Sequence, residues 1–198
     1  MKLFEEGVQA ARAAGVALIV VENLYGYGPG VGTISEATPE RATDSKGTVR
    51  RAMTRSLLDA HQSGRLRVAI GRASDYFGPR ADNSGITALA VEPVAGGKTI
   101  RWTGNLDVPH SVAYLPDIAR AYVQLGTSDA ADGEVWILPH GEPVTGRGSP
   151  VGQDVSASDA RISTTVAAMI PLTVPKISDA VINGGTRPNR AVWGMNNV

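Results

Sequence analysis

Val16-Ala17-Leu18-Ile19-Val20-Val21 is a short apolar run, and Leu66-Arg67-Val68-Ala69-Ile70 is a second one further along the chain. An aromatic-Gly-Pro tripeptide follows each run: Tyr27-Gly28-Pro29 and Phe77-Gly78-Pro79. Glycine adopts positive φ and proline fixes φ, so each tripeptide ends a strand and turns the chain. Apolar residues at helical spacing from about Lys46 to Gln62 predict a helix between the two runs. The order strand, helix, strand predicts a parallel α/β sheet.

The two aromatic-Gly-Pro turns also indicate where a ligand would bind. In an open parallel sheet, ligands bind beyond the carboxyl ends of the strands. Each turn directly follows such an end, so both are expected at the rim of a small-molecule site.

The remaining segments extend this pattern up to about residue 144. Helices are expected over residues 3–14, 86–91 and 116–126, and strands over residues 99–102 and 135–138. We therefore expect a partial Rossmann-like domain over residues 1–144, with flanking helices and a small substrate-side region. Residues 145–198 are rich in Gly, Ser, Thr and Asp, and we expect an atypical, poorly ordered tail there.

Composition excludes several classes of function. The 198 residues include 19 basic and 19 acidic ones, so the chain has no global field that would favour nucleic acid or membrane partners. Cysteine is absent, and no pair of histidines has the i, i+4 spacing of a zinc site, so we expect no metal centre. Acidic residues near the N-terminus are unlike a signal peptide, which favours a cytoplasmic protein.

Four segments resemble, in order, the motifs of the extended short-chain dehydrogenases/reductases of the NAD-dependent epimerase/dehydratase family. These segments are residues 22–29, 36–39, 71–79 and 112–121. The resemblance runs from about Leu3 to Pro143. It implies an oxidoreductase that binds NAD or NADP and acts on a sugar nucleotide or a related small carbonyl or alcohol substrate.

The resemblance also implies roles for individual residues. Asn23 lies where the family has a Ser or Thr hydroxyl that polarises the substrate, and Lys46 lies where a Lys grips the nicotinamide ribose. Four residues before that Lys the family has its proton-shuttling Tyr, but this chain has Ala42. Tyr27, or alternatively Tyr25, is then expected to serve as the proton donor. Lys46 has a second interpretation, as the first basic residue of a solvated helix face with residues 50, 51 and 55.

The second aromatic-Gly-Pro motif supplies further candidates. By the same resemblance Arg72, Ala73 and Ser74 contact the cofactor, and Asp75, which stands in the place of the family's Asn, contacts the substrate. His110 falls in the expected substrate region. Arg72 and Asp75 could instead form a purely structural ion pair, and His110 could be a surface residue.

The chain departs from the family pattern at its beginning. The family starts with a strand, a Gly-rich loop and a helix that bind the pyrophosphate, whereas this chain begins at the helix before the catalytic strand. Gly26-Tyr27-Gly28-Pro29-Gly30 is no substitute, because no helix follows it. A non-catalytic binding module and a truncated gene product are therefore the alternatives. The missing strands would leave a long apolar sheet edge, so either a partner such as a second copy of the chain covers it or the isolated chain is only marginally stable.

Overall fold

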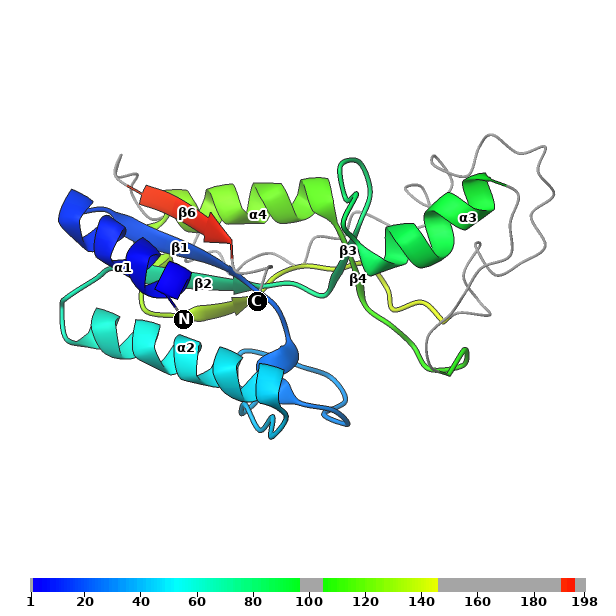
Figure 1. Ribbon diagram of the computed structural model, residues 1–198, viewed down its shortest axis with the longest axis horizontal. Coiled ribbons are helices and arrows are strands. Elements are labelled where there is room, and N and C mark those ends of the chain that lie inside the picture. Colours follow the sequence, from blue (N-terminus) through cyan, green and yellow to red (C-terminus); the bar gives the residue numbers. More distant parts are fainter. Residues whose placement is uncertain (1, 97–104, 146–189, 195–198) are drawn as a thin grey trace. The chain divides into compact units, whose positions relative to one another are not determined.

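A computed structural model describes residues 2–96, 105–145 and 190–194 of the chain (Figure 1). The chain divides into two compact units. The first comprises Met1–Ala73, Arg120–Leu138 and Lys176–Val198, and the second comprises Ser74–Ala119 and Pro139–Pro175. The predicted strand at 99–102 lies outside the described residues.

The first unit contains a four-stranded sheet in the order β5-β2-β1-β6. Its elements, in chain order, are α1 (Lys2–Ala14), β1 (Ala17–Glu22), the short helix η1 (Tyr25–Tyr27), α2 (Ser45–Gln62), β2 (Val68–Arg72), the short helix η3 (Asp129–Ala131), β5 (Val135–Ile137) and β6 (Arg190–Gly194). All the strand pairings in this sheet are parallel. The predicted parallel α/β architecture is confirmed, and the predicted helices and apolar strands lie within a few residues of the observed ones.

The free edge of β1 that the sequence predicts is not open. Strand β6 pairs in parallel with β1, from Ala17 opposite Arg190 to Val21 opposite Gly194. A strand from the end of the same chain therefore covers this edge of β1, and a second copy of the chain stays a prediction. The rest of the predicted tail, residues 146–189 and 195–198, lies outside the described residues.

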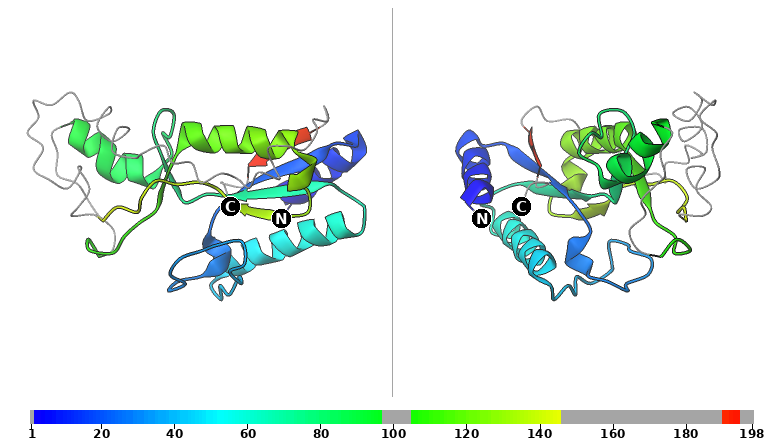
Figure 2. Two further views of the ribbon diagram at one scale, coloured as in Figure 1. Left: turned by 180° about the vertical axis from the view of Figure 1, so that it is seen from behind. Right: turned by 45° about the vertical axis from the view of Figure 1, so that its right-hand side comes forward.

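Side chains alternate between the two faces of each strand, which determines which helices pack on each face of the sheet. Leu18 and Val20 of β1 and Val68 and Ile70 of β2 form one buried cluster with side chains of α1 and α2. Both helices therefore lie on the same face of the sheet (Figures 1 and 2). Gly71 points to the opposite face, as the two-residue period requires, and there a side chain at this position would meet residues of α4 (Leu115–Thr127).

The second unit is built on a two-stranded parallel sheet. Its elements are β3 (Asp75–Phe77), the π-helical turn η2 (Thr87–Val91), α3 (Glu92–Ala95) and β4 (Val112–Tyr114), and α4 begins there before ending in the first unit. The rings of Phe77 and Tyr114 pack with their centroids 5.3 Å apart. Gly78 turns the chain at φ 107°, and a Cβ there would lie 2.7 Å from the Tyr114 ring. The second aromatic-Gly-Pro turn thus requires glycine for two reasons.

Among the described residues, no helix is both long enough and apolar enough to cross a membrane.

Candidate functional site

The carboxyl end of β1 leads directly into a short polar segment. Asn23 follows the strand, and its side-chain oxygen accepts a hydrogen bond from the Tyr25 amide at 3.0 Å. This contact holds the Asn23 carboxamide oxygen, and within the described structure its NH₂ group makes no hydrogen bond. The amide therefore keeps its donors for another partner.

The two tyrosines of η1 lie in different environments. Tyr25 is 52% exposed, whereas Tyr27 is 2% exposed. The guanidinium of Arg72 lies over the Tyr27 ring, 5.0 Å from its centroid, which is within cation–π range. Gly28 follows at φ 81°, and a Cβ there would lie 3.1 Å from the backbone of Ala42. The first aromatic-Gly-Pro turn thus packs closely against the chain segment that precedes α2.

The start of α2 is fixed by a cap and by close packing. Asp44 is the N-cap, and its carboxylate accepts from the Gly47 amide at 2.9 Å. A Cβ on Gly47 would lie 2.3 Å from Cβ of Ala42 and 2.6 Å from the Tyr25 carbonyl oxygen. The first turn of α2 therefore lies directly against η1. The Lys46 side chain is exposed in this turn, and it makes no ion pair or hydrogen bond within the described part of the chain.

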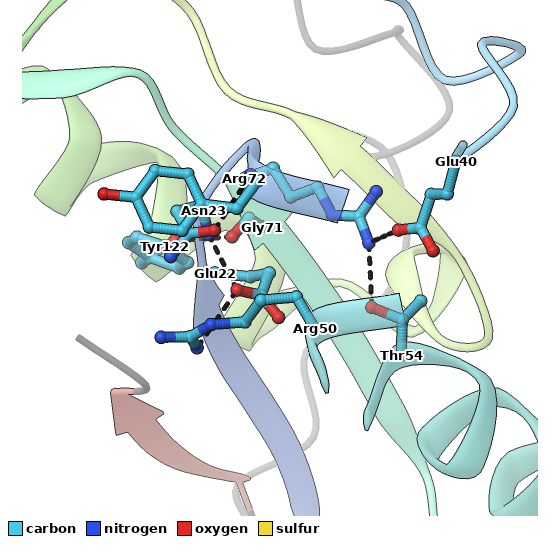
Figure 3. Close-up of polar contacts among 9 residues, drawn as sticks. Glu22, Asn23, Glu40, Arg50, Thr54, Gly71, Arg72 and Tyr122 are labelled. Carbon is cyan, nitrogen blue, oxygen red and sulfur yellow. Dashed lines mark hydrogen bonds and ion pairs between the residues drawn. The ribbon is translucent and has the colours of Figure 1, made fainter. Parts of the chain in front are cut away.

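Two ion pairs lie at the ends of β1 and β2, one fully buried and one partly buried (Figure 3). Glu22, the last residue of β1, accepts from Arg50 of α2 at 3.2 Å, and both side chains are almost fully buried. Arg72, the last residue of β2, donates to Glu40 and, at 2.8 Å, to the hydroxyl of Thr54. Both strand ends are thus tied to α2.

Burial dominates the electrostatics of Glu22. Its pKa is raised, chiefly by desolvation. The amide of Asn23 and the charges of Arg50 and Arg72 oppose this rise, and the charge of Glu40 adds to it. One of its oxygens accepts from Asn23 and Arg50, while the buried Oε2 has no hydrogen-bond partner in the described structure.

The profile of the NAD dependent epimerase/dehydratase family matches residues 5–138. The chain belongs to this family. No curated protein matches its sequence.

Solved structures of family enzymes share the fold. A UDP-glucuronic acid 4-epimerase from Bacillus cereus is 17% identical with a TM-score of 0.66, over 75% of this chain and 48% of its own. A dTDP-glucose 4,6-dehydratase from Streptomyces venezuelae, solved with NAD bound, is 21% identical with a TM-score of 0.57, over 71% and 44%. A UDP-glucose 4-epimerase from Thermotoga maritima is 19% identical with a TM-score of 0.61, over 71% and 47%. This epimerase/dehydratase family chain spans less than half the length of these three relatives.

The structure groups the predicted site residues by unit. Asn23, Tyr27, Lys46, Arg72 and Ala73 lie in the first unit, around the carboxyl ends of β1 and β2. Ala73 is buried, and its amide donates to the Glu22 carbonyl at 3.2 Å. These residues belong to one unit, and their grouping into a binding site and their individual roles stay predictions.

The other predicted residues lie in the second unit. Ser74 is half-buried, and its hydroxyl has no hydrogen-bond partner in the described structure. Asp75 is exposed at the start of β3. The backbone of His110 forms an antiparallel bridge to Val144. Their contacts with a substrate stay predictions. Among the described residues, no cluster of His, Asp and Glu could hold a metal ion.

One interpretation of the helix surface is corrected. Arg50 does not lie on a solvated face with Arg51 and Arg55, because it is 3% exposed and paired with Glu22. Neither Glu22 nor the burial of Arg50 was predicted from the sequence. The signal was present, since Arg50 precedes the apolar residues Met53 and Leu57 by three and seven positions and therefore shares their buried stripe.

Proposed function

We propose that the chain is an NAD(P)-dependent oxidoreductase of the epimerase/dehydratase type, acting on a sugar nucleotide or a related small carbonyl or alcohol substrate. The observation that supports this most is that two residues with donor groups lie on either side of η1. Asn23 follows β1 and precedes η1, and exposed Lys46 belongs to the first turn of α2, which packs on η1.

These groups fit a nicotinamide nucleoside. The Lys46 ammonium carries three donors suited to ribose hydroxyls, and the Asn23 NH₂ is suited to a carbonyl or hydroxyl oxygen of the substrate. When bound, the dinucleotide supplies hydride transfer. The contributions of this chain are to bind the ribose through Lys46 and to orient the substrate through Asn23.

Proton transfer is the step in which this chain departs from its family. Ala42 is 1% exposed and has no proton to give. We propose that a tyrosine of η1, either Tyr27 or the more exposed Tyr25, takes over the proton transfer that the family's Tyr performs at this position. Tyr25→Phe and Tyr27→Phe each remove one hydroxyl with little change of volume, and the variant that lacks the acid–base group loses about 10²- to 10⁴-fold in turnover.

Ala42 favours a second candidate, a dinucleotide-binding module without turnover. The two functions differ in one measurement. Calorimetric titration with NAD⁺, NADH, NADP⁺ and NADPH, followed by assays with UDP- and dTDP-sugars, separates them. Binding with turnover supports the oxidoreductase, and binding without turnover supports the module. If none of the four dinucleotides binds, both candidate functions are contradicted.

A further inference from the structure

A single buried carboxylate oxygen connects the two segments of the candidate site. Oε1 of Glu22 accepts from the backbone amide of Asn23 at 2.9 Å and from Nη1 of Arg50 at 3.2 Å. Asn23 begins the segment that leads to η1, and Arg50 belongs to α2. The same atom therefore bonds to the site's loop and to the site's helix (Figure 3).

Helix geometry carries this constraint to Lys46. Residues four apart on a helix lie on the same side, about 6 Å apart along the axis. Arg50 occupies the buried position and Lys46 the exposed position one turn earlier. Because Arg50 pairs with Glu22 at the end of β1, this pair constrains both the rotation of α2 and its position along the axis. Those two quantities decide where the Lys46 ammonium lies.

Two further contacts hold the same turn from the other side. Asp44 caps the Gly47 amide, and Gly47 packs on the Tyr25 carbonyl. The beginning of α2 is thus tied to the chain before η1 through Glu22 and to η1 itself through Gly47. Residues that contact a ligand need neighbouring residues that hold them rigidly in place, and these contacts give such support.

Stability alone gives no reason for the Glu22–Arg50 pair. An ion pair removed from water is often no better for stability than apolar side chains of the same volume. Here the cost is visible, because burial raises the pKa of Glu22 and leaves its Oε2 unpartnered in the described structure. Unlike an apolar contact, a hydrogen-bonded ion pair fixes the relative orientation of the two groups that form it.

We infer that Glu22 and Arg50 are positioning residues, which hold the first turn of α2, and with it Lys46, in register with Asn23 at the end of β1. The role of Lys46 and Asn23 in binding rests on the proposed function. The link between β1 and α2 through Glu22 and Arg50 does not depend on the proposed function, so two separate measurements are needed.

The first measurement is amide hydrogen exchange in the full chain. Glu22→Gln and Arg50→Met are expected to speed exchange at residues 23–27 and 45–48 at least tenfold more than at β2. Arg67→Met is the matched control, because it removes an arginine that pairs with Asp129 and Asp132 at the surface. Exchange that rises uniformly along the chain, or equally in Arg67→Met, would overturn the inference.

The second measurement is the NADH dissociation constant of the same variants. A small misplacement of a binding group costs up to about 100-fold. Glu22→Gln and Arg50→Met are therefore expected to raise this constant about tenfold to 100-fold, and Arg67→Met is expected to leave it unchanged. Should these variants fail to fold, Arg50→Lys keeps the charge and decides the matter, with an intermediate rise expected.

The outcomes separate the two proposals. If the wild-type chain binds no dinucleotide, the proposed function fails, and the exchange pattern alone tests the link between β1 and α2. If the wild type binds and Glu22→Gln and Arg50→Met bind equally well, the positioning inference fails while the proposed function stands.

Discussion

Glu22 and Arg72 occupy the same register position on the paired strands β1 and β2, yet each forms its ion pair with a different segment. Glu22 pairs with Arg50 of α2, and Arg72 pairs with Glu40 of the loop before α2. A direct Glu22–Arg72 pair would join only two strands that are already hydrogen-bonded. The observed pairs instead connect both strand ends to the segments that surround the candidate site.

The pH dependence of stability reports on Glu22. Because burial raises its pKa, the folded chain holds this proton more tightly than the unfolded chain does. The free energy of unfolding should therefore fall as pH rises from the ordinary glutamate pKa to the raised one. The groups that set this window are Arg50, Arg72, Glu40 and the Asn23 amide.

Chemical denaturation of wild type and Glu22→Gln between pH 4 and pH 8 measures this contribution. The glutamine variant should lack it, so the difference in stability between the two proteins should change with pH inside the window and be constant above it. A difference that is constant throughout would mean that the pKa of Glu22 is not raised.

Breaking the Glu22–Arg50 pair and replacing it should have opposite consequences. Arg50→Met leaves a buried carboxylate without its cation, which costs roughly 3–5 kcal/mol. The double variant Glu22→Leu/Arg50→Met removes both charges and should recover most of this loss. Urea unfolding measures the stability of each variant. If the double variant is as unstable as Arg50→Met, the pair contributes to stability in its own right.

Gly47→Ala should destabilise the chain although alanine favours helices. Alanine gains about 1 kcal/mol over glycine in a helix interior, but here its Cβ would overlap Ala42 and the Tyr25 carbonyl. Overpacking of this kind costs roughly 1–3 kcal/mol. Gly126→Ala is the matched control, because a Cβ there meets nothing within 4 Å. The two substitutions should shift the unfolding midpoint in opposite directions, and a shift in the same direction would contradict the close packing of α2 on η1.

Elements with strong local signals could be predicted from the sequence. The amphipathic stripe of α2 and the continuous apolar run of β1 predict their own structure, because the helix buries one face and the strand is buried on both. The parallel arrangement follows from their alternation along the chain.

Non-local pairing explains what the sequence could not predict. Strands β3 and β4 have three residues each and lie far apart in the chain, so neither carries a readable period. Strand β6 pairs with β1 from the far end of the chain. The Glu22–Arg50 pair similarly joins residues 28 positions apart. An arginine on a helix is ordinarily exposed, so the buried stripe that Arg50 shares with Met53 and Leu57 did not by itself identify Glu22 as its partner.

We propose that the end of β1 and the start of α2 form a dinucleotide-binding site through Lys46. Fluorescence titration of NADH and NADPH into wild type, Lys46→Ala and Lys2→Ala tests it most directly. Lys2 is the control, since its side chain is 90% exposed on α1 and pairs with Glu6 on the same helix. We predict saturable binding by wild type and Lys2→Ala, and binding at least tenfold weaker by Lys46→Ala. Equal affinity of all three proteins, or no binding by wild type, would contradict the claim.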